Sequence, residues 1–487
     1  MNTKYCITIS ILLLFSFYTF GQSELSQEQI LEDYTIFKEI ITTGHPGLYE
    51  YTSKSQWDSI FSAFEQRGIK EVKTSNDLFK SITTIADKAK DGHLIIYHPK
   101  MDTTPPLFPL LLKIISGKLY TDTDDFGIPL GSEIISVDGK SSQTMLHDLL
   151  KYAPSDGFNH TKKYRQIEKE FGILHYYEYG SRESYSVKHM TSDGETKTIE
   201  ITPKSFENIG NRYPYRNSHF ALYHQGTNGI DYFKNRIAKK WPFVYYIDSI
   251  NTAVLTINSF GLDPQKFKSK LIDIFKEIKK KKADNLIIDI RQNIGGYRIN
   301  AINLYSFLTN EPFKQRISES TITKVLPHEE NVMHTMSDYG EFFEMYFASA
   351  KKENDRWILK EDHAQAEMIP YKKTFSGEVY VLVGGHTFSA ASAFVLNAKN
   401  DKNITVVGEE TGGGYYFHTA QYFALYKLPN SEIMVRTPFV KIDKYVMDNS
   451  VPRGSGILPD KEVTLTVTDL IKGTDSQLDY VVKQIKK

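Results

Sequence analysis

Three loops of the sequence carry residues that can act on a substrate. They are Asp91-Gly92-His93, Asn293-Ile294-Gly295-Gly296 and Thr387-Phe388-Ser389-Ala390. Ser389 follows an apolar run at 379–383, typical of a buried strand, and precedes small residues typical of a closely packed helix. A hydroxyl at such a junction lies beside the first free N–H groups of the helix, where an acyl-transfer oxyanion can be stabilised. The sequence therefore indicates a nucleophile at Ser389, with a simple helix cap as the alternative.

His93 lies at a predicted corner, where a helix ends at Asp91-Gly92 and a strand begins that runs through Tyr97. An imidazole that titrates near neutral pH can take a proton from a serine and return it to a leaving amine. The alternative is a surface or capping histidine. A metal site formed with His98 is discounted, because the two side chains share a strand and no further ligands accompany them. We therefore expect no metal and no cofactor.

The elements that must position Ser389 are predicted between residue 245 and the C-terminus. Strands are expected at 252–257, 286–290, 379–383 and 404–407, with helices around 271–278 and 299–308 and from Ser389 onward. This alternation is typical of an α/β layer with mainly parallel strands, whose carboxyl-end loops are the usual place for chemistry. Asp289 and Arg291 are expected to form a buried ion pair that holds the glycine loop. The stretch 312–373 is predicted to be partly irregular and partly helical.

The rest of the chain is predicted to form separate regions. Residues 22–100 are expected to be a helical N-terminal domain that carries His93, with a first helix that starts at a Ser26/Gln29 capping box and stops at Gly44-His45-Pro46. Residues 101–205 are predicted to be a small β module of short strands, with a hairpin around Asp193-Gly194. Residues 206–244 are expected to be a connector or lid, and residues 245–487 the catalytic domain.

The N-terminus has the pattern of a secretory signal peptide, assigned to residues 1–21. Lys4 precedes an apolar run at 5–20, and cleavage is expected near Gly21. The only cysteine of the 487 residues, Cys6, lies inside this segment, so thiol chemistry is excluded from the exported chain. We expect a periplasmic or extracellular bacterial protein without an integral membrane span. A formal net charge of zero argues against a nucleic-acid partner, and the oligomeric state is left open.

Five motifs together resemble peptidase family S41, which comprises the C-terminal processing proteases and the tricorn-like proteases. They are LIIDIRQNIGG, HTFSAASAF, ITVVGEETGGG, GSEIISVDGK and GSGILPDKEV. The resemblance covers nearly the whole chain after the signal segment. It implies a multidomain α/β fold with a helical N-terminal region, a small PDZ-like β module and an α/β catalytic domain of the ClpP/crotonase-like type.

The resemblance also implies roles for individual residues. Ser389 would be the nucleophile, and the N–H groups of Ala390 and of Gly295 or Gly296 would form the oxyanion hole. The processing-protease branch takes its general base from a lysine in the turn that here is Gly412-Gly413-Gly414. The base is therefore expected to be His93, as in the tricorn-like branch. The glutamate of that branch is missing, and Asp448 is the expected third residue. Asp91 lies close to His93 in the sequence, and its alternative role is to cap the turn. Ser392 is the second choice of nucleophile.

Three functions from different classes fit these patterns. The first is an exported serine-type peptidase that hydrolyses peptide bonds through an acyl-enzyme on Ser389, acting on peptide or protein substrates. The second is a catalytically degenerate peptide-binding protein on the same fold, favoured by the missing lysine and glutamate. The third is a hydratase or another acyl-CoA enzyme with a related sheet, against which export argues because acyl-CoA is cytosolic. The retained serine, histidine and double glycine favour the peptidase.

Overall fold

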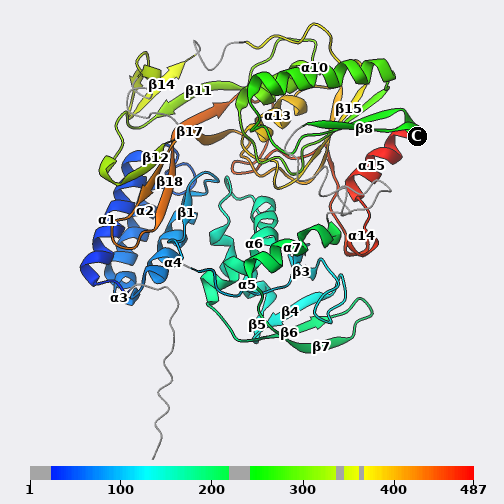
Figure 1. The fold of residues 1–487 in the computed structure, drawn as a ribbon. Helices are drawn as coiled ribbons and strands as arrows, with labels where there is room; N and C mark the ends of the chain where they lie inside the picture. The colour runs from blue at the N-terminus through cyan, green and yellow to red at the C-terminus, as the bar shows by residue number, and fades with distance from the viewer. Residues whose placement is uncertain (1–23, 102, 219–241, 336–344, 361–366) are drawn as a thin grey trace, which may run out of the picture.

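The structure is a computed structural model that describes residues 24–101, 103–218, 242–335, 345–360 and 367–487. The predicted signal segment and most of the predicted connector lie outside these ranges. The described residues form three sheets with helices packed on them (Figure 1). None of the helices in these ranges is both long enough and apolar enough to span a bilayer.

The first sheet is the parallel layer predicted from the sequence. Its strand order is β19-β16-β15-β10-β9-β8, and every neighbouring pair is parallel except β8 with β9. The strands are β8 (Phe243–Ile247), β9 (Thr252–Thr256), β10 (Asn285–Asp289), β15 (Glu378–Val383), β16 (Ile404–Gly408) and β19 (Lys461–Glu462). One face is covered by α10 (Pro264–Lys281), α11 (Arg298–Ser306) and α13 (Ala390–Lys399), and the other by α15 (Ser476–Ile485), which follows α14 (Val467–Lys472). Continuous apolar strands form here because both faces are buried.

The second sheet is antiparallel and was not predicted. Its order is β12-β17-β18-β11-β14-β13, and β1 pairs with β18. The strands are β1 (Ile95–Tyr97), β11 (Arg316–Thr321), β12 (Val332–Thr335), β13 (Lys351–Glu353), β14 (Arg356–Lys360), β17 (Phe417–Lys427) and β18 (Met434–Lys444). The prediction for 312–373 missed the strands β11 to β14, because these strands are short and carry many charged residues instead of an apolar run. The irregular stretches between them agree with the prediction. Strands β17 and β18 reach from the parallel sheet to the N-terminal helices (Figure 1).

The N-terminal helices confirm the local predictions. They are α1 (Gln27–Gly44), α2 (Lys54–Ala63), α3 (Ile69–Glu71) and α4 (Ser75–Ala86). Ser26 and Gln29 form the predicted capping box, and α1 ends at Gly44, as expected. The apolar faces of these helices join one core with β17 and β18. The turn between those two strands is also tied to α1, because Asp33 accepts hydrogen bonds from the backbone N–H groups of Asn430 and Ser431.

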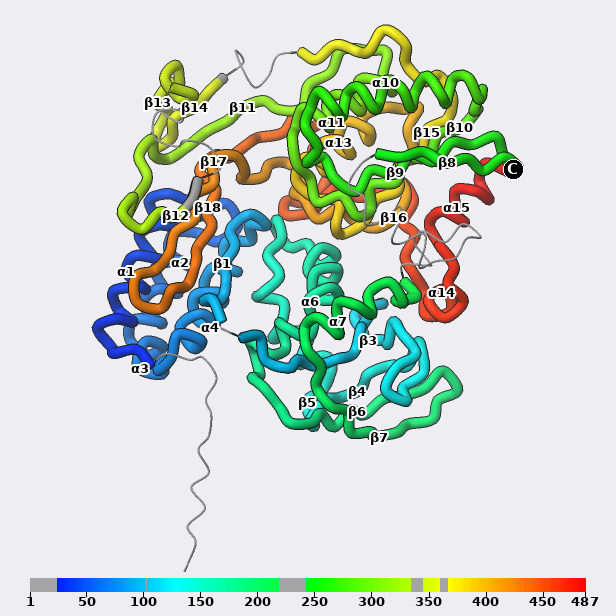
Figure 2. Tube along the Cα trace, in the orientation of Figure 1, coloured from blue at the N-terminus to red at the C-terminus, as the bar shows by residue number. Residues whose placement is uncertain are grey.

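The third sheet lies in the region predicted to be a β module. It comprises β2 (Leu112–Ile115), β3 (Lys118–Thr121), β4 (Glu133–Val137), β5 (Lys140–Ser141), β6 (Tyr185–Met190) and β7 (Thr196–Ile201), with the helices α5 (Ser142–Leu149) and α7 (Phe206–Arg212). The predicted hairpin is confirmed as β6–β7. The sequence missed α6 (Thr161–Tyr179), a helix of 19 residues that lies between this sheet and the parallel sheet (Figure 2). Buried Lys162, Lys163 and Glu168 interrupt its apolar periodicity.

Candidate active site

Ser389 lies at the junction of β15 and α13 in a strained conformation. Its φ is 55° and its ψ is −121°, a region that residues with a Cβ rarely adopt and that is over-represented at functional sites. The side chain makes no capping hydrogen bond, so the helix-cap alternative is wrong. Instead, the hydroxyl Oγ lies 3.2 Å from Nε2 of His93, a residue 296 positions earlier in the chain. The structure therefore brings the predicted nucleophile and the predicted base together.

The turn that carries Ser389 is tied to the glycine loop after β10. The Thr387 hydroxyl donates to the carbonyl of Ile290 at 3.0 Å, and the Phe388 N–H donates to the carbonyl of Asn293 at 3.1 Å. The same Thr387 hydroxyl accepts a hydrogen bond from the N–H of Gly384 at 3.1 Å. Because both loops leave the carboxyl ends of neighbouring parallel strands, these bonds hold Ser389 beside the glycine loop.

The glycine loop next to the serine contains an N–H group for which the described residues provide no acceptor. The N–H of Gly295 is used, because it donates to Oδ1 of Asn293 at 2.9 Å. Among the described residues, no acceptor takes the N–H of Gly296 or of Ala390, the first residue of α13. A Cβ at Gly295 would lie 2.8 Å from Cβ of Ser389, so only glycine permits this approach. Of the two predicted positions, the geometry favours Gly296 together with Ala390 as the oxyanion donors.

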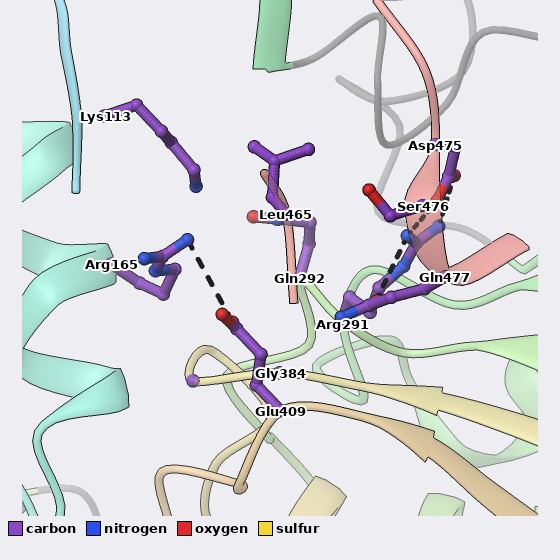
Figure 3. Close-up of a pocket in the computed structure, with 11 residues that line it drawn as sticks. Lys113, Arg165, Arg291, Gln292, Gly384, Glu409, Leu465, Asp475, Ser476 and Gln477 are labelled. Carbon is purple, nitrogen blue, oxygen red and sulfur yellow. Dashed lines mark hydrogen bonds and ion pairs between the residues drawn. The ribbon is translucent and has the colours of Figure 1, made fainter. Parts of the chain in front are cut away.

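Behind the glycine loop, the predicted pair of Asp289 and Arg291 is confirmed. Nη2 of Arg291 lies 2.6 Å from Oδ2 of Asp289, and both side chains are buried. Arg291 also contacts Asp475 at the start of α15, at 2.8 Å, so it fastens the end of β10 to the C-terminal helix. Figure 3 shows this contact beside a second, smaller polar cavity, across which Arg165 of α6 points toward Glu409.

His93 is held in an apolar and aromatic setting that suits a proton acceptor. The side chain is buried, and its ring centroid lies 4.6 Å from that of Phe388 and 5.6 Å from that of Phe423. Burial lowers the pKa of His93 to about 3; the Asp91 carboxylate opposes this shift, and the nearby cations Arg436 and Lys162 add to it. The imidazole is therefore neutral at physiological pH and can accept a proton from Ser389.

Asp91 both caps the turn of His93 and contacts a second histidine. Its Oδ1 accepts the N–H groups of His93 at 2.6 Å and of Leu94 at 3.2 Å. Its Oδ2 accepts a hydrogen bond from the Thr419 hydroxyl and lies 3.0 Å from Nε2 of buried His45. Burial alone would raise the pKa of Asp91, but His45, His93 and the Thr419 hydroxyl together outweigh it, and the net pKa is lowered. The carboxylate therefore stays ionised behind the base.

A second buried carboxylate, Asp156, joins the two halves of the site. It accepts the N–H of Gly92 at 2.8 Å and the N–H of Gly414 at 2.9 Å. Burial and the charge of Asp91 raise its pKa. One ring nitrogen of His93 and one oxygen each of Asp91 and Asp156 lie within 4.8 Å of one another, as metal ligands could. All four carboxylate oxygens are already contacted by N–H or O–H groups, so this cluster fits a hydrogen-bonded network better than a cation site.

The expectation for Asp448 needs correction. Asp448 lies on an exposed loop after β18, where it accepts hydrogen bonds from the N–H of Ser450 at 2.8 Å and from its hydroxyl at 2.7 Å. No hydrogen bond joins it to His93. A loop this close to the end of β18 forms its own local turn and does not reach the buried imidazole. The sequence missed His45, Asp156 and Thr419, because locally they carry no pattern beyond that of turn or strand residues.

Two further residues considered from the sequence lie away from the reacting pair. Ser392 is fully buried, and its hydroxyl donates to the carbonyl of Thr387 at 3.1 Å, so it is not placed to attack a substrate. His98 contacts the carbonyl of Pro99 at 2.8 Å and Oδ1 of Asn76 at 3.2 Å.

Ser389 and His93 open onto a cleft of about 770 Å³. Its walls come from α6, from the glycine loop, from the start of α13, and from one face of β17 and β18. The wall of β17 contains a bulge, in which Gln421 and Tyr422 have φ values of 56° and 47°. Such bulges redirect side chains next to active sites. The volume is sufficient for several residues of an extended peptide beside the serine.

Comparisons with known proteins agree with this architecture. Residues 251–463 match the model of peptidase family S41. The structure of mature CPAF complexed with lactacystin superimposes with a TM-score of 0.65 at 16% sequence identity, over 94% of this chain and 98% of that chain. A point mutant of CPAF gives a TM-score of 0.65 at 15% identity, over 94% and 97%. At such identities the likeness shows the fold alone. No curated protein sequence matches the chain.

Proposed function

The family match makes this chain a serine peptidase of family S41, and we propose that it cleaves peptide bonds through an acyl-enzyme on Ser389 with His93 as general base. The observation that carries the proposal is the 3.2 Å separation of the Ser389 hydroxyl and Nε2 of His93. Packing alone does not require a strained serine to meet a buried imidazole at the edge of a cleft. A nucleophile and its base do require that contact.

The proposed reaction has two steps. In the first, Nε2 of His93 accepts the Ser389 proton while Oγ bonds to the substrate carbonyl carbon, and the resulting oxyanion accepts hydrogen bonds from the N–H groups of Gly296 and Ala390. The imidazolium then donates its proton to the leaving amine, and the C–N bond breaks. In the second step, His93 takes a proton from water, whose oxygen attacks the acyl ester. The ester bond breaks, and the proton returns to Ser389.

The group that orients His93 is proposed to be Asp91 rather than Asp448. Asp91 is ionised and buried, and its Oδ1 fixes the backbone of His93 by accepting the N–H of His93. Its negative charge also stabilises the imidazolium that forms during the reaction. His45 supports it, since Nδ1 of His45 accepts the N–H of Gly47 at 3.2 Å and so leaves Nε2 to face the carboxylate.

The degenerate peptide-binding alternative is not favoured. A binding protein would have no use for a serine in a strained conformation beside two unpaired N–H groups. Two finer proposals rest on the sequence: export directed by residues 1–21, and a PDZ-like character of the sheet β2–β7 with α5. The ClpP/crotonase-like type of the parallel-sheet domain, residues 245–487, is likewise proposed from the sequence resemblance.

Labelling with a serine-reactive fluorophosphonate tests the proposal. We expect one stoichiometric adduct on Ser389, found by peptide mass spectrometry, and parallel loss of hydrolysis of a quenched fluorescent peptide library. The Ser389→Ala variant should take no label, whereas Ser392→Ala should be labelled like the parent. A folded protein that is neither labelled nor active would support the binding protein. Peptidase activity that survives Ser389→Ala would require another nucleophile.

A further inference from the structure

The cleft beside Ser389 carries an excess of positive charge. Its lining contains one carboxylate, Glu170, against six cationic side chains. The cations are Lys162, Lys169, Arg298, Arg316, Arg436 and Lys444. A basic group is repelled by this excess of cations, whereas an acidic group is attracted by it.

The carboxylates just outside the lining do not cancel this charge. Glu319 is buried and paired with Arg316. Both oxygens of Asp156 accept backbone N–H groups, and Asp91 is engaged with His45 and Thr419. Even when these three are counted together with Glu170, cations remain in excess.

Lys444 is a buried cation of this lining with unused hydrogen-bonding capacity. It is the last residue of β18, is 2% exposed, and lines the cleft. An ammonium group has three N–H donors, but among the described residues the Lys444 group has one hydrogen-bond acceptor, the carbonyl of Gly414 at 2.6 Å. A buried ammonium with unused donors is costly unless a ligand supplies an acceptor.

His418 of β17 offers a second unused polar atom at the same wall. Its side chain is buried and lines the cleft, and within the described part of the chain Nδ1 has no hydrogen-bond partner. Burial, together with the charge of Lys444, lowers the pKa of His418 well below its usual value, so the ring is neutral and carries one N–H. Its centroid lies 6.0 Å from that of His93. One residue of an extended chain spans roughly 3.3–3.6 Å, so this wall faces substrate residues within about two positions of the cleaved bond.

We propose that Lys444 and His418, within the field of Arg298 and Arg316, form a subsite for a carboxylate of the peptide substrate. The inference rests on the proposed peptidase function and specifies its substrates as peptides with an acidic group next to the cleaved bond. The carboxylate comes either from an Asp or Glu side chain or from the C-terminus of the peptide. Both present the same two oxygens to an ammonium and an N–H group.

A matched peptide set tests the subsite and separates the two sources. Glu and its isostere Gln are placed in turn at each position within three residues of the cleaved bond, in peptides blocked at both ends. A further pair of peptides has Gln at all of these positions. One of the two ends in a free carboxylate and the other in an amide. We expect kcat/KM to be about tenfold or more higher for the acid at one position, or for the free C-terminus, because charge-assisted hydrogen bonds are the strong ones. Equal rates for every acid and its neutral partner would overturn the subsite.

Binding to the inactive Ser389→Ala variant, followed by fluorescence anisotropy, separates this subsite from the chemistry. Selective binding of the acidic peptides without hydrolysis by the parent protein would support the subsite while the proposed reaction fails. Hydrolysis by the parent protein without any preference for acidic peptides would support the proposed reaction and contradict the subsite.

Variants then assign the preference to its residues. In Lys444→Met the ratio of acidic to neutral kcat/KM should fall to about one, because the ammonium is lost while the stem is kept. Lys427→Met is the matched control: it removes the same charge from β17, outside the cleft, and should keep the parent ratio. If circular dichroism shows that Lys444→Met is not folded, His418→Phe is the second test, with an expected loss of at least threefold in the ratio. A folded variant that keeps the parent ratio at both positions would overturn the assignment.

Discussion

The two sides of the proposed active site are held in place by different forces. Ser389 stands on the edge of the parallel sheet, where strands and helices pack through apolar side chains such as Val381 and Leu382. His93 stands on a turn whose neighbours are the buried polar groups Asp91, His45, Thr419 and Asp156. The strength of apolar packing does not depend on protonation, whereas the strength of hydrogen bonds and ion pairs made by carboxylates and imidazoles does. The comparison indicates that the base side is the more sensitive half to charge and to pH.

The two sides also differ in where their partners lie in the sequence. The nucleophile side draws on neighbouring strands β10 and β15 and on the loops that follow them. The base side gathers residues from the end of α1, from the turn after α4, from the loop before α6 and from β17. A substitution on the base side can therefore affect the docking of several regions as well as the chemistry. The following predictions test this contrast.

The largest expected effect is that of Ser389→Ala. Removing the nucleophile should lower kcat/KM by about 10⁴-fold or more. The free energy of unfolding should change by less than about 0.5 kcal/mol, because the hydroxyl makes no capping hydrogen bond and the surrounding core is untouched. Peptide hydrolysis and urea unfolding measure the two quantities. A large loss of stability would mean that the serine is structural.

His93→Gln should lower kcat/KM by about 10²- to 10⁴-fold, the usual contribution of a general base. The loss should appear in kcat, since the ring contacts the reacting hydroxyl. Asp448→Asn is the control, and its kcat/KM should stay within about twofold of the parent because the residue is exposed and away from the imidazole. If Asp448→Asn were as damaging as His93→Gln, Asp91 would not be the orienting acid.

Asp91→Asn should damage stability and activity together. The new amide group faces the Thr419 hydroxyl and Nε2 of His45, so the free energy of unfolding should fall by about 3 kcal/mol, as for other broken buried pairs. Leu382→Ala, on the nucleophile side, should lower the free energy of unfolding by a similar amount, about 2–5 kcal/mol, because it leaves a cavity. At a temperature where both are folded, only Asp91→Asn should lower kcat, by about 100-fold. Equal kcat values for the two variants would remove the contrast between the sides.

The smallest expected effect is a flat acid limb of the pH profile. Because burial lowers the pKa of His93 to about 3, the base stays neutral in mild acid, and kcat/KM should change less than about threefold between pH 8 and pH 5. The free energy of unfolding, unlike kcat/KM, is expected to depend on pH in this range. The unfolded histidine binds a proton below about pH 6.5 while the folded one does not, so the contribution of His93 to the free energy of unfolding falls as the pH drops from about 6.5 toward 3. An acid limb centred at 6.5, in protein shown to be folded, would contradict the burial of the base.

The sequence predicted the nucleophile side better than the base side for a physical reason. Buried parallel strands are continuous apolar runs, and helix caps are local, so β10, β15, α1 and the hairpin β6–β7 followed from short patterns. Helix α6 was missed because it buries charged residues, and strands β11 to β14 of the second sheet were missed because they are short and charged. The wrong placement of Asp448 has the same origin, since nothing local distinguishes an acid beside an imidazole from an acid on a loop.

By itself, the sequence determined the strands of the parallel sheet, the N-terminal helices and which serine ends up at a strand-to-helix junction, because these depend on neighbours a few positions away. Only the tertiary structure decided which imidazole meets that serine from 296 positions away, which carboxylate supports the imidazole and which cations face the substrate. Those choices depend on how three sheets pack against one another. Packing is a property of complementary surfaces that no single stretch of the chain contains.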